Sequence, residues 1–494
     1  CRNMAKFVVR LTDEAATDAE RFGPKAANQA ALGHAGLPTP GGFVLGADAY
    51  FHQLESLGLV DAAEQAVSLP FMESRGPIAE VRIGLFSEPI AADIEAELLD
   101  AYRTLTAETG MRLAVRSSSL MEDTEGSSFA GQFQTFLGIE GETDFLTAVR
   151  ACWGALWSPQ AMRYMQDKKI SAIDTAMSVL VQPLIEAEAS GGGLSQTADG
   201  GMSVSATWGL GEALAQGEVV PDRYDLTSEG KLVEAISGQE FEHSAYCHAH
   251  QAPPQNPMAA VAATQAQGHE HDHDHAHKHS HDHDHDHDHD HDHDHDDAPS
   301  GDETTRLQCL TTDDVHQLAR YMKVAEKMMG LAVEVEWAKD EIGIKMLQAR
   351  PLHVEEPIVL DEVWRGRPGL RGHPGGMGWG SGRACVINCE CEISRLNYGD
   401  VLVTNVAGPA LVGVLPRVAA IVAELGGSTS HLASLGRERG IPMVLGVAGA
   451  TRQIPDGATV GVDGVGGIVR WLKPELNEKQ PMPMMHPGEM RSPG

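Results

Sequence analysis

The sequence predicts an α/β (α+β) protein with a large N-terminal domain and a small C-terminal domain. Over most of the chain, amphipathic helical stretches alternate with short strands rich in Val and Ile. Of the 494 residues, 42% are hydrophobic, which is enough to fill more than one core. Two breaks, at residues 252–303 and 356–376, interrupt this pattern and divide the chain.

The large domain, residues 5–355, contains both kinds of periodicity. Apolar residues recur every three or four positions over residues 144–165 and 313–329, which indicates amphipathic helices. Short apolar runs bounded by polar residues or glycines predict strands at residues 176–181, 202–207, 331–337 and 344–349.

The segment 252–303 is predicted to be a disordered insertion, because its composition cannot form a core. Fourteen His, most of them alternating with Asp, lie from His269 to His295. Imidazole and carboxylate groups suit Zn²⁺ or Ni²⁺, so we expect several weak, exchangeable sites there. A metal-binding or metal-responsive role through this tract is an alternative function for the chain. The other interpretation is a low-complexity expansion tolerated in a surface loop.

The C-terminal part begins with a Pro-, Gly- and Arg-rich segment, residues 356–376, which predicts a hinge linker. Residues 377–473 contain short Val and Ile runs separated by glycines and predict the small domain. The last segment, residues 474–494, is predicted to be a flexible tail.

The negative charge of the chain makes some classes of binding partner unfavourable. The formal net charge is −33, of which −11 comes from residues 269–297, and such a surface disfavours nucleic acid and anionic membranes. No stretch approaches the ~18 apolar residues of a membrane span. Seven scattered Cys do not form a disulfide framework, and the N-terminus shows no export signal. We therefore expect a cytoplasmic protein.

Residues 426–434, GGSTSHLAS, connect a predicted strand to a predicted helix that His431 opens. Free backbone N–H groups and the positive helix end would stabilise a phosphate on the imidazole and favour the neutral ring, which can attack phosphorus. Thr429 or Ser430 would cap the helix and hydrogen-bond the phosphate. An ordinary helix N-terminus with a surface histidine has the same spacing, so spacing alone leaves both interpretations open.

Two further segments place a cation beside small or hydroxyl residues. Lys25, in the sequence GPKAA, lies at the start of a predicted helix, where its ammonium group would meet phosphates. Arg116 ends a predicted strand before three serines, and a guanidinium can bind a polyphosphate through two parallel hydrogen bonds. On these residues alone, a solvated helix lysine is the favoured interpretation of the Lys25 pattern.

Charged and amide residues alternate along the predicted strands 331–337 and 344–349. Glu334 and Glu336 share one face of their strand, and so do Gln348 and Arg350. Two carboxylates on one face are unfavourable unless a cation joins them, and Mg²⁺ that also binds nucleotide phosphates would do so. An exposed face with solvated charges is the alternative.

These motifs together resemble the phosphoenolpyruvate synthase and pyruvate phosphate dikinase family. Residues 426–447 are similar to its swivelling phosphohistidine domain, with Arg437-Glu438 and Gly440-Ile441-Pro442 in the positions of the family pattern. Residues 5–240 and 310–352 resemble its nucleotide-binding domain in several separate blocks. The resemblance implies an ATP-grasp-like domain followed by a small swivelling β/α domain.

The resemblance also implies an ATP-dependent dikinase-type phosphotransferase in which His431 carries the phosphoryl group, assisted by Thr429 and Arg116. It implies that Gly131 and Thr135 contact phosphates and that Gln182 meets the adenine edge. Mg²⁺ would bind Glu336 and Glu334, the second of which stands where the family usually has Asp. The residues implied to bind ATP are Lys25, Arg116, Gly131, Thr135, Gln182, Glu336, Gln348 and Arg350.

The chain departs from the family pattern at residues 190–195, SGGGLS, where we expect a loop of different shape. Residues 122–132 match the water-dependent branch of the family and its antibiotic-phosphorylating relatives. The family's pyruvate site is a (β/α)₈ barrel of about 250 residues, much longer than the segment after residue 472. We therefore expect a small-molecule acceptor, pyruvate or another compound such as a phenol or an antibiotic, to bind elsewhere, for instance on a separate acceptor-binding subunit.

Overall fold

The computed structural model describes most of the chain apart from the insertion and the two ends. All of the described residues belong to one compact unit. Gly131, the tract from His269 to His295 and the tail 474–494 lie outside them. The described residues are 6–70, 73–121, 133, 135–238, 308–352, 354, 364, 367, 369–405 and 409–472.

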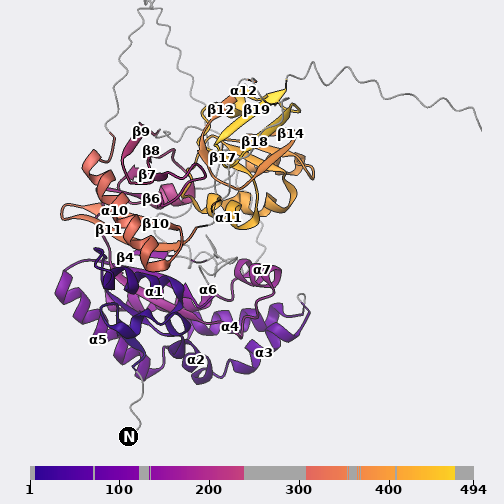
Figure 1. Ribbon diagram of the computed structural model, residues 1–494. Coiled ribbons are helices and arrows are strands. Elements are labelled where there is room, and N and C mark those ends of the chain that lie inside the picture. The colour runs from indigo at the N-terminus through magenta and orange to yellow at the C-terminus, as the bar shows by residue number, and fades with distance from the viewer. Residues whose placement is uncertain are drawn as a thin grey trace, which may run out of the picture. The chain divides into compact units, whose positions relative to one another are not determined.

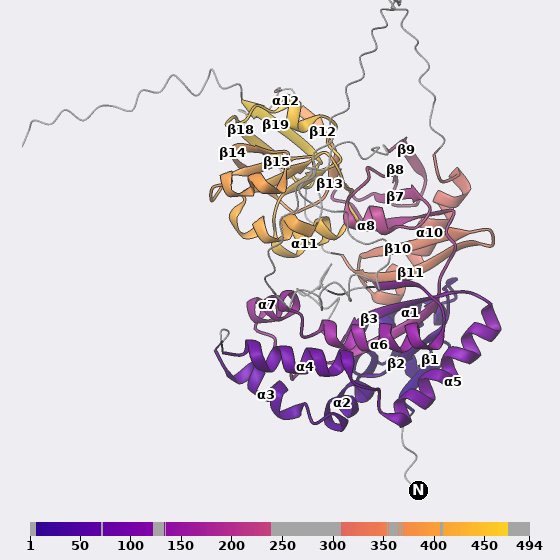
Figure 2. The same ribbon diagram turned by 180° about the vertical axis from the view of Figure 1, so that it is seen from behind.

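The first sheet is antiparallel, with the strand order β1-β2-β5-β3-β4. Helices α1 and α6 pack against its central strands, and Figures 1 and 2 show helices α2 to α6 around it. Its strands are β1 (Val8–Arg10), β2 (Phe43–Leu45), β3 (Leu113–Ser119), β4 (Thr135–Ile139) and β5 (Met177–Pro183). The helices are η1 (Glu14–Thr17), α1 (Ala19–His34), α2 (Ala47–Ser56), α3 (Val60–Ser68), α4 (Arg75–Ser87), α5 (Ala92–Thr109), α6 (Glu142–Ala155) and α7 (Pro159–Lys168).

The amphipathic stretch predicted over residues 144–165 is two helices, α6 and α7, instead of one. The first helix ends at Ala155, and Ser158 caps the second, because its hydroxyl accepts a hydrogen bond from the backbone N–H of Ala161. Pro159 occupies the first turn of α7, where its missing N–H carries no cost. The apolar spacing continues across the break, so periodicity alone did not reveal it.

The second sheet is also antiparallel, with the strand order β11-β10-β6-β7-β8-β9. Helix α10 (Thr312–Met329) packs on it and buries Val315, Leu318 and Met322 against Val335 and Trp337. The strands are β6 (Ala189–Leu194), β7 (Met202–Trp208), β8 (Asp222–Leu226), β9 (Leu232–Ile236), β10 (Val333–Asp340) and β11 (Gly343–Pro351), and the short helix α8 (Glu212–Gln216) precedes β8. The four strands and the helix predicted at 313–329 are thus confirmed.

Helix α1 lies between the first two sheets. Phe22, Ala26 and Ala30 pack against the first sheet's core, and Leu32 joins the core of the second sheet. The side chain of Gln29 donates a hydrogen bond to the carbonyl of Met346 on β11 at 2.9 Å. The helix therefore fixes the strands of one sheet relative to those of the other.

The segment 190–195 is not the loop expected from the sequence. Residues 189–194 form β6, which pairs with β10 on one side and β7 on the other. Consecutive glycines are typical of a loop, but here other segments of the same chain approach the strand so closely that side chains would not fit. The expectation was wrong because that packing comes from residues far away in sequence.

The third sheet belongs to the C-terminal region, with the strand order β12-β19-β18-β14-β15-β16-β17-β13. Strands β14 to β17 pair in parallel, and buried residues cover both of their faces. Its elements are β12 (Gly369–Arg371), β13 (His373–Pro374), β14 (Trp379–Ile387), η3 (Glu390–Arg395), β15 (Val401–Thr404), η4 (Pro409–Arg417), β16 (Ala420–Ala423), α11 (His431–Arg439), β17 (Met443–Leu445), α12 (Ala450–Gln453), β18 (Thr459–Asp463) and β19 (Ile468–Leu472).

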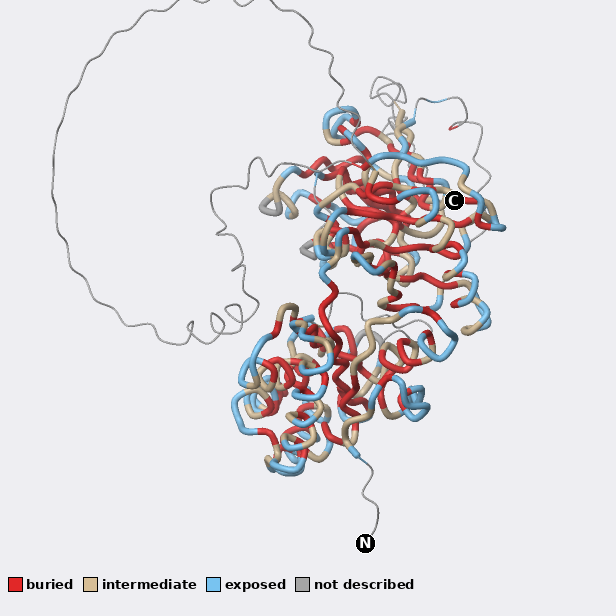
Figure 3. Tube along the Cα trace, turned by 90° about the vertical axis from the view of Figure 1, so that its left-hand side faces the viewer, coloured by how far each residue is buried: buried red, intermediate tan, exposed pale blue. Residues whose placement is uncertain are grey.

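The hinge predicted over residues 356–376 is too long at its C-terminal end, because β12 and β13 already belong to the third sheet. Its glycines serve close packing: a Cβ atom on Gly376 would lie 2.0 Å from the carbonyl oxygen of Ile441. Figure 3 shows that buried residues concentrate on the strands of the sheets. Among the described residues, no helix is long and apolar enough to cross a membrane.

Candidate active site

The residues expected to bind ATP on the second sheet lie opposite each other on two paired strands. In the antiparallel register of β10 and β11, Glu334 pairs with Arg350 and Glu336 pairs with Gln348. Directly opposed residues point to the same side of a sheet. The structure thus brings the four polar side chains onto one face.

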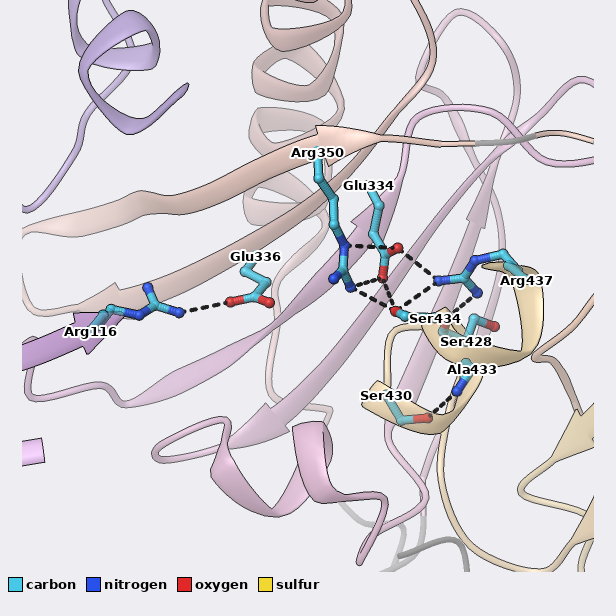
Figure 4. Close-up of polar contacts among 9 residues, drawn as sticks. All are labelled: Arg116, Glu334, Glu336, Arg350, Ser428, Ser430, Ala433, Ser434 and Arg437. Carbon is cyan, nitrogen blue, oxygen red and sulfur yellow. Dashed lines mark hydrogen bonds and ion pairs between the residues drawn. The ribbon is translucent and has the colours of Figure 1, made fainter. Parts of the chain in front are cut away.

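Glu334 is held by two arginines from different regions of the chain (Figure 4). Arg350 donates two hydrogen bonds to its carboxylate, at 3.2 and 2.9 Å, and Arg437 of α11 donates one at 2.7 Å. The hydroxyl of Ser434 lies 2.7 Å from Arg350 and 3.3 Å from Glu334. Burial by itself raises the pKa of Glu334, but the two guanidinium groups outweigh burial and lower the pKa to about 2. The carboxylate is therefore ionised at neutral pH.

Glu336 has a sparser environment than Glu334. Its carboxylate accepts a hydrogen bond from Nη2 of Arg116 at 3.3 Å, and its side chain is 32% exposed, compared with 5% for Glu334. Burial raises the pKa of Glu336, and the charges of Arg116, Arg350, His431 and Lys25 lower it on balance. The Nε of Arg116 is buried and has no hydrogen-bond partner among the described residues. This end of the face leaves polar atoms for a ligand.

Lys25 reaches the site because α1 is divided at Gly23. That glycine has φ 76°, which suits glycine alone, so Pro24 and Lys25 begin the second helical segment. A Cβ atom at Gly23 would lie 2.6 Å from the hydroxyl of Ser118 on β3, so the chain also needs glycine for this close approach. The ammonium of Lys25 donates to the carbonyl of Ser117 at 3.2 Å. The helix start predicted at Lys25 is therefore present.

His431 opens α11, as predicted, and Ser430 is the residue that caps the helix. The Ser430 hydroxyl accepts a hydrogen bond from the backbone N–H of Ala433 at 3.3 Å. Burial lowers the pKa of His431, Glu336 and Glu334 oppose this effect, and Arg350 and Lys25 reinforce it, with a lowered pKa as the result. The imidazole is therefore neutral at pH 7. These four charged groups, all outside the C-terminal region, act on the ring because they lie close to it.

Thr429 does not cap α11; its side chain is buried against the second sheet instead. Its Oγ1 is buried and has no hydrogen-bond partner among the described residues. A Cβ atom built on Gly192 of β6 would lie only 2.6 Å from the Cβ of Thr429. The loop that carries His431 is thus in direct contact with the second sheet.

The remaining predicted residues are more dispersed. Thr135 begins β4 and pairs across the strands with Arg116. Gln182 is buried on β5, where its amide donates to the carbonyl of Gly41 at 3.3 Å. Gly131 and the tract from His269 to His295 lie outside the described residues. Within the described part, no group of three or more His, Cys, Asp and Glu side chains is arranged to hold a metal ion.

Ser434 and Arg437 contribute to this site although their roles were not predicted from the sequence. The helical spacing offered a signal for Ser434, which lies three positions beyond His431 and on its side of α11, and Arg437 lies a further three positions along the helix. Their partners gave no such signal: Glu334 and Arg437 are 103 residues apart in sequence.

Comparison with known proteins identifies the family of the chain. Residues 19–359 match the family model for the pyruvate phosphate dikinase AMP/ATP-binding domain, and residues 396–467 match the mobile domain of PEP-utilising enzymes. The first match covers well over half of the chain. The chain belongs to the pyruvate phosphate dikinase family and contains its nucleotide-binding and mobile domains.

Several curated relatives that match almost the whole chain are named phosphoenolpyruvate synthase or probable phosphoenolpyruvate synthase. The phosphoenolpyruvate synthase of Aeropyrum pernix is 30% identical over 94% of this chain and 58% of its own length. That of Pyrococcus furiosus is 28% identical with the same coverage, and the probable one of Archaeoglobus fulgidus is 29% identical over 97% of this chain and 60% of its own length. The chain thus spans about three fifths of the length of these relatives.

Proposed function

We propose that this chain transfers the β-phosphoryl group of ATP to His431 and then passes it to a small-molecule acceptor. The observation that carries the proposal is the position of His431. His431 opens α11 in the C-terminal region, and Ser434, one turn further along this helix, contacts Arg350 and Glu334 of the nucleotide-binding region. Burial lowers the pKa of His431, and the charges of Glu336, Arg350, Lys25 and Glu334 also act on it.

His431 is suited to be the nucleophile. Its lowered pKa keeps the imidazole neutral at physiological pH, and a neutral ring nitrogen has the lone pair that attacks phosphorus. The ring sits at the N-terminal end of α11, where the helix dipole and free N–H groups favour the negative charge of a transferred phosphate.

The polyphosphate would be held by cations and hydrogen-bond donors that the first two sheets supply. Lys25, Arg116, Gln348 and Arg350 are proposed to bind it, and Thr135 lies beside Arg116. Nε of Arg116 and Oγ1 of Thr429 are both buried without a hydrogen-bond partner in the described part of the chain, which supports a polar ligand at this site. Gln182 is proposed to meet the adenine, and Gly131 the phosphates.

Mg²⁺ is proposed to bind at the Glu336 end of the face. Glu336 and Glu334 are the carboxylates that β10 presents on this face, and Mg²⁺ is an ion that takes most of its ligands from phosphates and water. Glu336 is the better ligand, because both oxygens of Glu334 already accept hydrogen bonds from arginines. When bound, the ion would neutralise charge on the phosphates.

The proposed reaction has two phosphoryl-transfer steps. A ring nitrogen of His431 attacks the β-phosphorus, the bond to the α-phosphate oxygen breaks, and AMP leaves. Water then attacks the γ-phosphorus of the enzyme-bound pyrophosphoryl group, releasing inorganic phosphate and leaving phospho-His431. The role of the protein is positioning and charge neutralisation.

The acceptor is proposed to be pyruvate or another small molecule bound outside the described residues, for example on a separate subunit. The names of the curated relatives support pyruvate. Binding of Zn²⁺ or Ni²⁺ by the tract from His269 to His295 rests on composition alone, and the proposed reaction does not need it.

The test is incubation of the purified chain with ATP and Mg²⁺, following AMP and inorganic phosphate and mapping acid-labile phosphohistidine by mass spectrometry. We expect AMP and phosphate in equal amounts, and one phosphoryl group on His431. Formation of ADP without phospho-His431 would contradict the proposal.

A further inference from the structure

The three glycines of β6 face two different environments. Gly193 points to the core of the second sheet, where a Cβ atom would lie 2.6 Å from the sulfur of Met322 on α10. Gly192 points to the other side, and a Cβ atom there would lie 2.6 Å from both Cβ and Cγ2 of Thr429. Carbon atoms that are not bonded need about 3.5 Å. A side chain at residue 192 therefore requires the His431 loop to move by about 1 Å from its observed position.

A buried ion-pair cluster ties the helix after this loop to the same sheet. Arg437 joins two parts of the site: its Nη1 donates to the carbonyl of Ser428, in the His431 loop, at 2.6 Å, and its Nη2 donates to Glu334 at 2.7 Å. The side chains of Glu334, Arg350 and Arg437 are 5, 10 and 12% exposed. A charge pair this deep depends on both partners, because removing one leaves the other buried and uncompensated.

Other contacts extend the same interface on both sides of the loop. The backbone N–H of Gly426 donates to the carbonyl of Val219 at 3.1 Å. A Cβ atom built on Gly427 would lie 2.7 Å from Cγ of Pro221, so these two residues are in close contact. The hydroxyl of Tyr164 on α7 contacts the carboxylate of Glu438 at 2.5 Å. The His431 loop and α11 therefore also contact the segment before β8 and helix α7.

We infer that Gly192 and the Glu334–Arg437 ion pair are docking determinants, which hold the His431 segment in the position where its ring faces the nucleotide-binding residues. Gly192 supplies the space that Thr429 fills, and Arg437 fixes the loop through Ser428 while anchoring α11 to Glu334. Both are positioning residues. That docking occurs is inferred from the contacts alone. That docking serves phosphoryl transfer to His431 rests on the proposed function.

Docking can be tested without catalysis by a disulfide. In the full chain, the double substitution Gly192→Cys and Thr429→Cys places two Cβ atoms about 1 Å closer together than a disulfide needs. A small outward shift of the loop brings them to the required distance. The matched control is Gly193→Cys with Thr429→Cys, whose first cysteine points to the opposite side of β6. We expect mass spectrometry after mild oxidation to find the 192–429 link in high yield and no 193–429 link. Equal yields, or no link in either protein, would overturn the inference.

The positioning role is tested by single-turnover labelling from [β-³²P]ATP at saturating ATP. Alanine at residue 192 displaces the loop by about 1 Å, a misplacement that can cost about a hundredfold in rate. We expect that loss for Gly192→Ala with an unchanged dissociation constant for ATP. Gly193→Ala, which adds the same methyl group toward the core, is expected to lower thermal stability but to retain labelling close to that of the wild type.

Arg437 is tested in the same assay. We expect Arg437→Ala to lower the labelling rate about tenfold to a hundredfold, the effect of losing a charged hydrogen bond, and Arg437→Lys to recover part of it. Arg439→Ala, which removes the same charge from the same helix, is expected to label normally. Unchanged labelling of both Gly192→Ala and Arg437→Ala would overturn the inference. Absence of labelling in the wild type, with the disulfide still formed, would refute the proposed function and leave the docking contact standing.

Discussion

The two ends of the polar face on β10 differ more than their sequence suggests. Glu334 and Glu336 are two residues apart on one strand, yet Glu334 accepts hydrogen bonds from two arginines and a serine, and Glu336 from Arg116 at 3.3 Å. The Glu334 end joins two regions of the chain and is almost closed to solvent. The Glu336 end is more exposed and adjoins a buried guanidinium nitrogen that lacks a partner among the described residues. Although Glu334 and Glu336 occupy equivalent positions on the same face of β10, Glu334 is suited to hold the His431 segment and Glu336 is suited to bind a ligand.

The largest expected effect is that of His431→Ala. Removing the only proposed carrier atom should reduce labelling from [β-³²P]ATP to background, because no neighbouring group can replace the imidazole. His34→Ala, a substitution of an exposed histidine at the end of α1, is the control and should label normally. Stoichiometric labelling of His431→Ala would show that the phosphoryl group is carried elsewhere.

The next effect separates the two carboxylates directly. Glu336→Gln should raise the Mg²⁺ concentration needed for half-maximal labelling by roughly tenfold to a hundredfold, while its stability stays near that of the wild type. Glu334→Gln should leave the Mg²⁺ requirement unchanged but lower the free energy of unfolding by roughly 3 kcal/mol, because two buried guanidinium groups lose their counter-ion. Magnesium titration and urea unfolding of both variants provide the measurement. A shared phenotype would mean that the two ends act as one site.

The pH dependence of labelling gives a third and smaller effect. Burial and the charges of Arg350 and Lys25 lower the pKa of His431, although Glu336 and Glu334 act in the opposite direction. The folded protein therefore binds this proton less tightly than a free imidazole, and the neutral nucleophile persists below pH 6.5. We expect the acid limb of the single-turnover rate to have its midpoint below 6.5. A midpoint clearly above that value would indicate that the carboxylates control the ring.

The fold and part of the site follow from local sequence patterns. The alternation of side chains along a strand predicted that Glu334 shares a face with Glu336 and Gln348 with Arg350. The sequence GGSTSH predicted that a helix starts at His431. The strand β6 and the cluster around Arg437 were not predicted. β6 pairs with β10, and Arg437 pairs with Glu334; both partners are more than a hundred residues distant in sequence, and no local period records such contacts.

The smallest expected effect is that of the segment 252–303. Unlike the residues on the polar face of β10, this segment is predicted to take no part in binding ATP. Deleting it should change the dissociation constant for ATP by less than about threefold, since long surface insertions add little free energy. Calorimetric ATP titrations of the deleted and full-length chains measure this. Loss of cooperative unfolding in the deletion variant would show that the segment contributes to the core.

The most direct measurement of the central claim compares two labelled forms of ATP. The purified chain is incubated with Mg²⁺ and either [β-³²P]ATP or [γ-³²P]ATP, and label on His431 is counted after the reaction has released inorganic phosphate. The proposed reaction predicts that β-label is retained on His431 and that γ-label appears as free phosphate. Retention of γ-label with ADP as the other product would contradict it, because His431 would then be attacking the terminal phosphorus.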